Sequence, residues 1–494
     1  MNKFGIGQPV KRFEDRRLLS GEGRFINDIN LAGQAHAVVV RSPHAHARIK
    51  SIARSAASAA PGVLGIFTGE DLAADGLGTM LPTVQRKRPD GSPMFARSPP
   101  GLATGHVRFV GDPFLLILAE TRSLALDAAE LIEVDFDELP SVTDTARAAA
   151  GKAAVWDECP DNISNVFETG DGAATDAAFA KAAKIVYRRY VISRVYAHFM
   201  EPRGVIGNYD PGEDRYTLYA DVQYPHRVRN ALASKIFKIP ENKMRVIAGD
   251  VGGGFGPKGW QYPEHRLMLW ASRKLGRPVK WTATRSESFL SDHQGRDLAS
   301  ESELALDRDG KFLGLRGRNT LNGGAYPITV TPLVKGVELM TGVYAIPTAH
   351  FHARATVSNK PPVNNYRSSG RPEAMYIIER LIDLAAHKTG IDPVELRRKN
   401  MIPIIGEGYV NALGLAYDSG DFPKVMDSAC SLADRSGFAA RRAKARKRGR
   451  YRGMGVANYL ELTGGYPTER TEITVHAKGV VDVVIGPLSS GQGH

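Results

Sequence analysis

Apolar and polar positions alternate in short blocks through the first third of the chain. Residues 24–29 and 35–43 have the apolar content of two strands. Residues 61–72 predict a strand that leads into a helix at Thr68, because Thr68 can cap the helix while Asp71, three residues later, bonds back. This pattern favours a fold that mixes strands and helices.

Residues 107–136 give the clearest single unit of this region. The run FLLILAE predicts a buried strand, Thr121 can cap the helix that follows, and IEVDF predicts a second strand. The expected apolar positions of the helix are Leu124, Leu126, Ala129 and Leu131. The order strand, helix, strand predicts a βαβ unit.

A polar stretch, residues 145–176, is expected to link this region to a second one with strands and helices. The second region contains a helix over residues 225–238, with Val228, Leu232 and Ile236 on one stripe, and a strand over residues 243–251. Further elements are a helix over 263–275 that ends at Gly276, a hairpin that turns at Asp309-Gly310, a helix over 372–388 that ends at Gly390, and a helix that begins after Asp392.

A third region begins near Tyr417 and reaches the turn Gly491-Gln492-Gly493-His494 directly after the strand VVDVVIG. Domains seldom stop at an unpaired turn, so we expect a chain that continues further in the complete protein. The expected domains are residues 12–142, 165–408 and 415–494, with the third one incomplete.

Composition excludes several classes of protein. The 494 residues suggest about three domains, and the apolar fraction of 43% and charged fraction of 24% are ordinary for globular chains. No apolar run is long enough to span a membrane, and the first residues lack the apolar core of a signal peptide, so we expect a cytoplasmic protein. Cys159 and Cys430 lie in no CxxC or Cys/His spacing, which excludes an iron–sulfur cluster held by this chain alone.

The net charge of +12 suggests an anionic partner. Part of the excess lies in residues 441–452, RRAKARKRGRYR. This segment is typical either of a nucleic-acid patch or of a solvated helix end that runs into Gly449. Because no aromatic platform, zinc finger or helix-turn-helix pattern accompanies it, we predict the helix end and no nucleic-acid binding.

The strongest local motif is the glycine run of residues 252–256, GGGFG, which follows a strand. Glycines allow backbone N–H groups to point into one concavity, which favours oxyanions and phosphates. A P-loop is excluded because Pro257 separates Gly256 from Lys258, and a dinucleotide-binding Rossmann site lacks the expected acid near Val279. A tight turn without a ligand remains the structural alternative.

Other motifs accompany the glycine run in a fixed order. They are HFMEPR (198–203), DVQYP (221–225), NNYRSSGRPEA (364–374) and SSGQGH (489–494). Together with residues 107–140, ELRRKNMIP and YDSGDF, they resemble the molybdopterin-binding large subunit of the xanthine dehydrogenase, aldehyde oxidase and carbon monoxide dehydrogenase family. The resemblance implies an α+β fold in which an a/b hammerhead domain precedes two molybdopterin-binding domains, the second of them incomplete here.

The resemblance also implies roles for individual residues. Gln223 matches a glutamine whose amide faces a metal oxo group, and an amide donates a hydrogen bond without adding charge. Arg367 matches an arginine beside the metal; the alternative is a buried ion pair with Glu373. The backbone of Gly253, Gly254, Phe255 and Gly256 would donate to the same cofactor, and Gln492 would bond the pterin.

His198 and Glu201 suggest metal ligation or base chemistry at first sight. In an isolated HxxE pair we instead expect a structural role, either as caps or through an ion pair of Glu201 with Arg203. No residue of this chain is predicted to ligate a metal.

Departures from the family pattern bear on the substrate. Copper-containing carbon monoxide dehydrogenases of the family have a cysteine where this chain has Ser368. Purine-oxidising members have a glutamate at Gly259, a phenylalanine at Ser369 and, by ungapped counting, an arginine at Lys335. These four positions are expected to face the substrate, and their identities favour an aldehyde or another N-heterocycle over carbon monoxide or purines.

The resemblance implies a molybdenum hydroxylase subunit with a molybdenum–molybdopterin cofactor in its cytosine dinucleotide form. Electrons would pass to a small [2Fe-2S] subunit and an FAD subunit, since this chain holds neither an iron–sulfur cluster nor a flavin. The family's glutamate base is expected beyond His494, so no catalytic residue is assigned within this chain. Two other classes remain open, namely a non-catalytic truncated remnant and a nucleotide-binding protein without redox chemistry.

Overall fold

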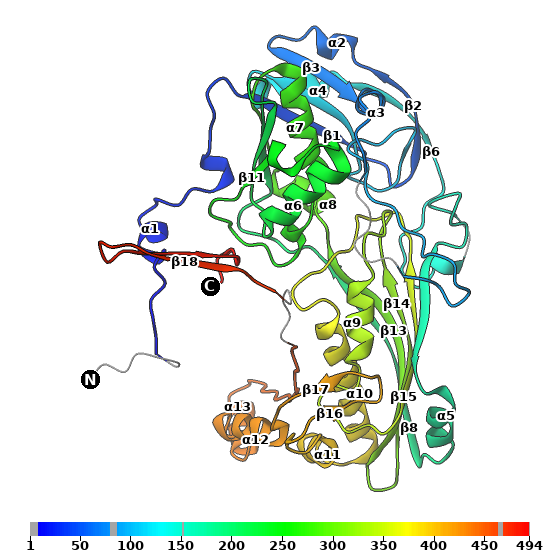
Figure 1. Cartoon of the computed structure of the whole chain (residues 1–494). Helices are drawn as coiled ribbons and strands as arrows, with labels where there is room; N and C mark the ends of the chain where they lie inside the picture. Colours follow the sequence, from blue (N-terminus) through cyan, green and yellow to red (C-terminus); the bar gives the residue numbers. More distant parts are fainter. Residues whose placement is uncertain (1–7, 80–85, 151–152, 463–467, 494) are drawn as a thin grey trace.

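The computed structural model describes residues 8–79, 86–150, 153–462 and 468–493. Figure 1 shows two stacked bodies, an upper one built on a seven-stranded sheet and a lower one built on a long five-stranded sheet. Helices and strands mix within both bodies, and the α+β expectation is confirmed.

The seven-stranded sheet combines strands from two distant parts of the chain. Its order is β11 (Met244–Ile247), β10 (Arg215–Ala220), β9 (Gly204–Asp210), β12 (Val279–Thr282), β1 (Ala35–Arg41), β5 (Pro113–Ala119) and β3 (Val63–Thr68). The junction is the parallel pair β1 and β12, where Ala35 lies opposite Val279. One apolar core covers both parts, because Leu116 and Leu118 pack in the same cluster as Leu218 and Trp281.

Helices cover the faces of this sheet. The helix α7 (Pro263–Leu275) packs on β9, and Gly276 ends it with φ +69° as expected. Thr68 caps α3 (Gly69–Ala74) and Asp71 bonds back, which confirms the predicted capping box. The remaining helices of the upper body are α2 (Ser55–Ser58), α4 (Arg122–Glu130), α6 (Pro225–Ala231), the π-helix η3 (Leu232–Phe237), α8 (Arg285–Ser291) and the 3₁₀ turns η4 (Glu241–Lys243) and η5 (Pro257–Gly259).

The βαβ expectation for residues 107–136 is wrong. The strand β5 is antiparallel to both of its neighbours, whereas β6 (Glu133–Glu138) pairs with β2 (Ala47–Ala53) in a separate three-stranded sheet that also contains β4 (His106–Val107). The helix between them buries Ala125 and Ala128 and leaves Leu126 and Leu131 exposed. Residues 24–29 are also not a strand, because they contain the 3₁₀ turn η1 (Ile26–Asp28).

The lower sheet has the order β7 (Ile163–Gly170), β15 (Ala349–Thr356), β14 (Phe312–Asn322), β13 (Gly295–Leu306) and β8 (Lys184–Val195). Its edge strand β7 lies inside the stretch expected to be a linker, so that expectation is wrong for residues 163–170. In Figure 1, α9 (Thr331–Glu338) and α10 (Arg371–Thr389) lie on one side of the sheet and α5 (Gly172–Ala180) on the other. The hairpin at Gly310 and the end of α10 at Gly390 are as predicted.

The last part of the described chain lies against the lower body and then leaves it. Asp392 caps α11 (Pro393–Asn400), and β16 (Tyr409–Val410), β17 (Ala416–Tyr417), α12 (Phe422–Leu432) and α13 (Phe438–Arg446) follow. The basic segment forms the end of α13 and reaches Gly449 at φ +68°, which fits the predicted helix end. Within the described part of the chain, none of the helices combines the length and hydrophobicity of a membrane-spanning segment.

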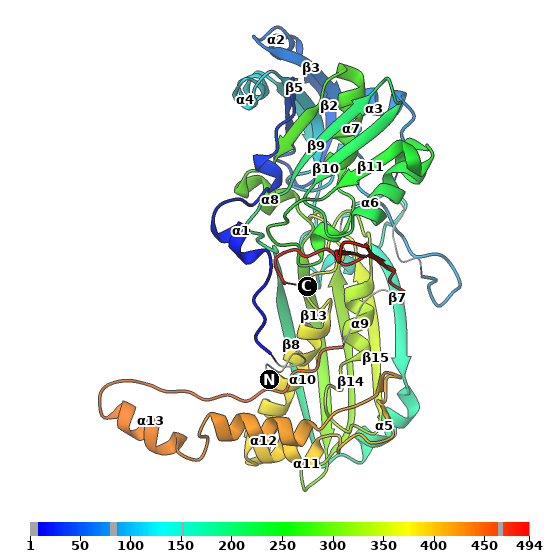
Figure 2. The same ribbon diagram turned by 60° about the vertical axis from the view of Figure 1, so that its left-hand side comes forward.

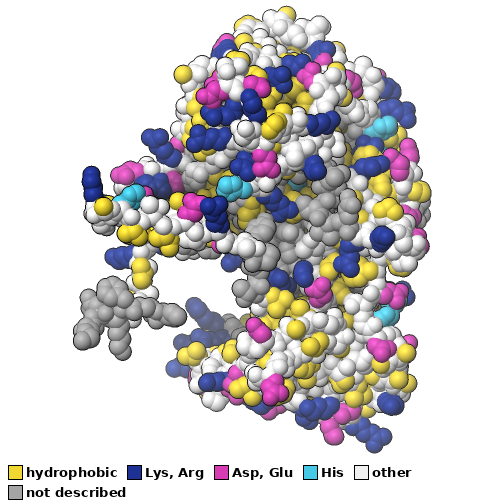
Figure 3. Space-filling model, in the orientation of Figure 1, with side chains coloured by type: hydrophobic (Ala, Val, Ile, Leu, Met, Phe, Trp, Pro, Cys, Tyr) yellow, Lys and Arg dark blue, Asp and Glu magenta, His cyan; other side chains and the backbone are white. Residues whose placement is uncertain are grey.

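The final hairpin, β18 (Thr471–Val475) and β19 (Val481–Ile485), stands off the body as an arm. All residues of both strands are exposed, and hydrophobic side chains are visible along the arm in Figure 3. The short helix α1 (Asp15–Leu19) and the C-terminal end of the chain both lie beside the junction of the two bodies, as Figure 2 shows.

Candidate functional site

A cavity of about 1000 Å³ lies where segments from six parts of the chain meet. It is lined by the glycine run, Gln223, the loop around Arg367, the C-terminal turn at Gln492, the α1 segment, and His198 and Met200 of the HFMEPR motif. Five motifs that are far apart in the sequence therefore share one space.

The glycine run forms one wall of this cavity and holds Gln223 against it. Gly253 and Gly256 have φ of +98° and +99°, and Phe255 between them has +49°, a conformation that favours glycine. The N–H of Gly256 donates to Oε1 of Gln223 at 2.8 Å. This bond leaves the Nε2 amide of Gln223 as the donor, which suits recognition of an oxo ligand.

Gly254 allows the close approach of these two groups. A Cβ atom on Gly254 would lie 2.2 Å from Cδ and 2.7 Å from Nε2 of Gln223. Real Cβ atoms do not occupy such positions, so any side chain at Gly254 must displace Gln223.

The loop that carries Arg367 is fixed to the glycine run. The N–H of Arg367 donates to the carbonyl of Phe255 at 3.0 Å, while its side chain is exposed on the cavity wall. Glu373 pairs with Arg296 at 3.2 Å, and Arg296 also donates to the carbonyl of Arg367 at 2.9 Å. The alternative of an Arg367–Glu373 ion pair is therefore wrong, because Arg296 takes that carboxylate.

Ser368 and Ser369 continue this loop and both line the cavity. Their φ values of +71° and +34° are unusual for residues with a side chain, and Gly370 follows at +87°. Strained backbone of this kind persists where the surrounding structure determines it, and it is frequent at functional sites. A Cβ on Gly370 would meet the carbonyl of Pro332 at 1.8 Å, so the loop packs tightly on α9.

The other two predicted substrate positions lie outside the cavity wall. Gly259 is buried behind Tyr224, whose ring would be 2.8 Å from a Cβ at that position. Lys335 lies on α9 and pairs with Glu338 at 2.9 Å. Tyr224 lines the cavity and covers Gly259, so at this point of the wall the tyrosine, and not the glycine, can contact a ligand.

The C-terminal turn and the α1 segment close the cavity from the opposite side. The N–H of Ser490 donates to Oε1 of Gln492 at 2.5 Å, and Arg12 donates to the carbonyl of Gly491 at 3.0 Å. Arg17 holds Asp250 through two bonds of 2.6 Å. Arg12 pairs with Asp15 at 2.6 Å, so both arginines of this wall have carboxylate partners.

Two buried polar atoms on residues that line the cavity lack a hydrogen-bond partner within the described residues, namely Oγ of Ser490 and Oδ1 of Asn365. Buried polar groups are nearly always satisfied, so such atoms indicate a missing ligand or water. Together with the donor amide of Gln223 and the exposed guanidinium of Arg367, they fit a large anionic cofactor with many oxygen and nitrogen atoms.

A buried ion cluster of Lys258, Glu201 and Asp221 lies directly behind the glycine run. Nζ of Lys258 is 2.5 Å from Oδ2 of Asp221 and 3.4 Å from Oε2 of Glu201, and it donates to the Glu201 carbonyl at 2.9 Å. Glu201 accepts the N–H of Gly252 at 2.7 Å. Burial raises the pKa of Asp221 to about 6, although Lys258 opposes this shift.

This cluster connects the glycine run to Gln223. The carbonyl of Lys258 accepts the N–H of Gln223 at 3.0 Å. Lys258 therefore holds Gln223 directly and holds the glycine run through Glu201. Lys258 is not among the residues expected at the site, and the expected ion pair between Glu201 and Arg203 is wrong, because Glu201 pairs with Lys258 instead. The signal available in the sequence was a lysine two residues after the glycine run, beyond Pro257.

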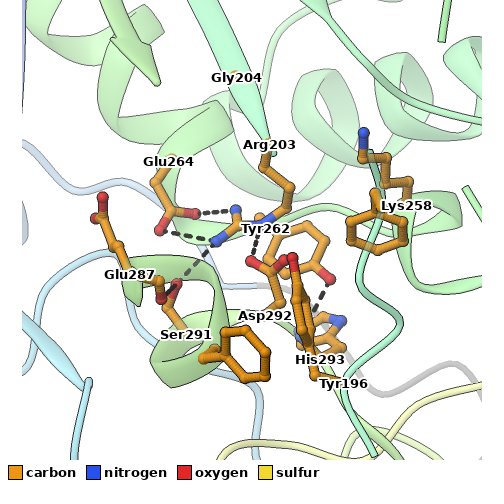
Figure 4. Close-up of polar contacts among 12 residues, drawn as sticks. Tyr196, Arg203, Gly204, Lys258, Tyr262, Glu264, Glu287, Ser291, Asp292 and His293 are labelled. Atoms are coloured by element: carbon orange, nitrogen blue, oxygen red, sulfur yellow. Dashed lines mark hydrogen bonds and ion pairs between the residues drawn. The ribbon is translucent and has the colours of Figure 1, made fainter. Parts of the chain in front are cut away.

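Arg203 belongs to a second buried network, which Figure 4 shows. It pairs with Glu264 at 2.7 Å and with Asp292, and its guanidinium lies 3.8 Å from the centre of the Tyr262 ring. The His293 ring stacks on the other side of this tyrosine at 4.1 Å. The network joins β9, α7 and α8. It also fixes the end of the HFMEPR segment, where the chain enters β9.

Burial in this network lowers the pKa of His293 and of His265 to about 3, and the nearby Arg203 acts in the same direction. Below pH 6.5 the unfolded chain protonates these histidines whereas the folded chain does not, so they remove stability as the pH falls toward 3. Asp112 and Asp221, with pKa values raised to about 7 and 6 by burial, act in the opposite sense.

We expect His293→Gln to reduce this acid sensitivity. The variant should lose less stability than the parent between pH 6.5 and pH 5, by up to about 2 kcal/mol at about 1.4 kcal/mol per pH unit. Urea unfolding at both pH values measures the difference, and His476→Gln, at an exposed pair with Asp482, is the matched control. If the free energies of unfolding of variant and parent differ by the same amount at both pH values, His293 is not a source of the acid sensitivity.

Comparisons with known proteins add an independent finding. The molybdopterin cofactor-binding domain family matches residues 155–401, and the a/b hammerhead domain family of aldehyde oxidase and xanthine dehydrogenase matches residues 20–140. The nicotine 6-hydroxylase large subunit of Paenarthrobacter nicotinovorans is 34% identical over 99% of this chain and 61% of its own length. The carbon monoxide dehydrogenase large chain of Hydrogenophaga pseudoflava is 35% identical over 97% of this chain and 62% of its own length.

The solved structure of quinoline 2-oxidoreductase from Pseudomonas putida 86 superposes with a TM-score of 0.92 at 36% identity, covering 100% of this chain and 64% of that one. The chain thus spans a little under two thirds of the length of these relatives. By the domain families that it matches and by its fold, the chain belongs to the xanthine dehydrogenase and aldehyde oxidase family of molybdopterin-binding proteins.

Proposed function

We propose that the chain is the cofactor-binding part of a molybdenum hydroxylase that oxidises an N-heterocycle or an aldehyde. The observation that carries this proposal is the convergence of Gln223, the glycine run and Arg367 on one cavity. When bound, a molybdenum–molybdopterin cofactor supplies the two-electron redox chemistry of such a hydroxylation. The protein residues bind it, orient it and provide hydrogen-bond donors.

Gln223 is the central positioning residue of this proposal. Its Oε1 accepts the N–H of Gly256, so its Nε2 donates into the cavity as a neutral group. Arg367 adds a positive charge on the same wall, and Gln492 closes the opposite side. We propose the cytosine dinucleotide form of the cofactor, whose anionic phosphates would compete with Asp15 and Asp250 for Arg12 and Arg17.

In this proposal, the general base is not one of the residues that the structure describes. Among the described residues, the carboxylates that line the cavity are Glu14 and Asp250, and Arg17 holds Asp250 through two bonds. A carboxylate bound in this way has its pKa lowered by Arg17 and accepts a proton poorly.

Electrons are proposed to leave through a [2Fe-2S] subunit and an FAD subunit. The chain has two cysteines, too few to hold an iron–sulfur cluster by themselves. Cys159 is buried, which raises its pKa to about 12, and Cys430 lies on α12. The relatives named above are themselves described as large subunits or large chains. We keep domains 12–142, 165–408 and 415–494, and a cytoplasmic location, as parts of the proposal.

The cavity wall favours an aromatic substrate. Tyr224 and Phe255 are partly exposed on it, and Ser368 replaces the cysteine that a copper site needs. Nicotine and quinoline, which appear in the names of two relatives, are N-heterocycles. The complete enzyme should therefore reduce an artificial electron acceptor with quinoline or a pyridine much faster than with carbon monoxide or xanthine.

Turnover of carbon monoxide or xanthine at a rate equal to that of the heterocycles would overturn this substrate assignment. Elemental analysis tests the cofactor assignment separately. Stoichiometric molybdenum supports the hydroxylase, whereas bound phosphorus without molybdenum would favour a nucleotide-binding protein instead.

Gln223→Glu separates the role of the donor amide from its structural role. The carboxylate can still accept the N–H of Gly256 but cannot donate, so we expect retained molybdenum and a kcat lowered by about 10²–10³. The KM should change far less. Gln34→Glu is the matched control, because Oε1 of Gln34 also accepts a backbone N–H, from Leu31 at 2.9 Å, outside the cavity wall. A kcat equal to that of the parent enzyme would rule out Gln223 as the donor.

A further inference from the structure

Two histidines and a glutamate meet on the lower sheet, remote from the cavity. His350 and His352 are two residues apart on β15 and therefore point to the same face. Glu168 on the edge strand β7 lies directly opposite His352 in the register, and Gly170 lies opposite His350. The pairing of the two strands thus places three potential metal ligands side by side.

The ligand atoms of the three side chains lie within 4.8 Å of one another. One carboxylate oxygen of Glu168 is 2.8 Å from Nδ1 of His352, and the other is 3.4 Å from Nε2 of His350. The imidazole rings are 4.8 Å apart and inclined at 72°. One nitrogen of each ring therefore faces the same carboxylate, so the three ligand groups converge on one small volume.

Access to the site is open on the side of His350. Its cross-strand neighbour is Gly170, at φ +91°, and a Cβ at Gly172 would be only 3.4 Å from the His350 ring. A larger side chain at Gly172 would cover the imidazole, but the glycine leaves that side of the ring open to an ion and its water ligands. The side chains of His350 and His352 are 20% and 48% exposed.

We infer that Glu168, His350 and His352 form a binding site for a divalent first-row transition-metal ion such as Zn²⁺. Imidazole nitrogens with one carboxylate suit Zn²⁺, Ni²⁺ or Cu²⁺, whereas Ca²⁺ and Mg²⁺ prefer oxygen ligands alone. Three protein ligands leave further coordination positions to water. This site departs from the expectation that the chain ligates no metal.

Charged side chains near the three ligands affect how tightly the site binds a cation. Arg316 and Arg318 on β14 lie beside His350 and His352 in the register. Glu303 and Asp176 pair with Arg316 at 2.7 and 2.9 Å and offset its charge. Arg318 opposes a cation at close range, so Arg318→Gln should tighten binding of Zn²⁺ by about two- to threefold, since exposed charges are screened.

A bound ion would tie the edge strand β7 to β15. Because a ligand that binds only the folded chain stabilises it, Zn²⁺ should raise the unfolding temperature of the full chain. The same concentration of the ion should raise the unfolding temperature less when any of the three ligands is removed.

Calorimetric titration of the chelator-treated full chain with Zn²⁺ tests the inference. We expect one ion per chain, and a loss of affinity of at least about tenfold in Glu168→Gln, His350→Gln and His352→Gln, since even contacts behind a metal ligand contribute about 10–100-fold. His476→Gln is the matched control, because His476 pairs with one carboxylate, Asp482, at 2.7 Å without a second imidazole.

Circular dichroism melting in the presence of chelator shows whether each variant folds like the parent. Folded variants that bind Zn²⁺ as tightly as the parent, or a parent chain without a one-to-one site, overturn the inference. Weaker binding by Arg318→Gln also counts against it, because that variant keeps all three ligands.

Discussion

Gly254→Val is expected to empty the cofactor site while leaving most of the fold in place. The new side chain begins at a point 2.2 Å from Cδ of Gln223, so it must displace the donor amide and occupy the cavity wall. Molybdenum per chain should fall by at least about tenfold, a loss typical of disturbed contacts around a metal group. The stability cost should remain near 1–3 kcal/mol, about that of an overpacked side chain.

Elemental analysis of the complete enzyme measures this loss, and thermal melting measures the stability. Gly406→Val is the matched control, because an added Cβ there meets no atom within 4 Å. Unchanged molybdenum in Gly254→Val would show that the glycine run does not contact the cofactor.

Lys258→Met should have the largest effect on stability. The substitution leaves the carboxylates of Asp221 and Glu201 without their buried cation, and breaking a buried ion pair from one side costs about 3–5 kcal/mol. The glycine run and Gln223 lose their common anchor, so molybdenum content should fall as well. Urea unfolding and elemental analysis of the same preparation measure the two effects.

A second substitution distinguishes the charge effect from a loss of packing. Asp221→Asn in the Lys258→Met background removes one unpaired charge and keeps the oxygen that accepts the Gly204 N–H, so part of the stability should return. Lys335→Met, in an exposed pair with Glu338, is the control and should cost at most about 1 kcal/mol. A double variant no more stable than Lys258→Met would mean that packing, not charge, sets the loss.

Local signals predicted single elements well and their partners poorly. The caps at Thr68 and Asp392 and the glycine ends of two helices follow from chemistry within a few residues. The separation of β5 and β6 into different sheets depends on which distant strands they meet, and periodicity carries no information about that. The strand β7 escaped prediction because its residues are only partly apolar.

The candidate site shows the same division. Motif order placed Gln223, Arg367 and Gln492 together through the resemblance to a family, and all three line one cavity. Lys335 was assigned by ungapped counting, which fails wherever loops differ in length, and it lies on α9 instead. The partner of Glu201 is Lys258, 57 residues away, so proximity in the sequence to Arg203 misled the assignment.

The sheet that joins β1 to β12 ties parts of the two matched domain families together. Residues 35–119 and 204–282 share one apolar cluster, with Leu116 and Leu118 packed among Val205, Leu218 and Trp281, while Phe114, Leu115 and Ile117 belong to a second cluster within the first stretch. Because the shared cluster is buried only when both stretches are in place, both should unfold in one cooperative transition. A protease that cuts the connecting segment would therefore break the chain without releasing a domain, and the two fragments should stay associated as complementary halves.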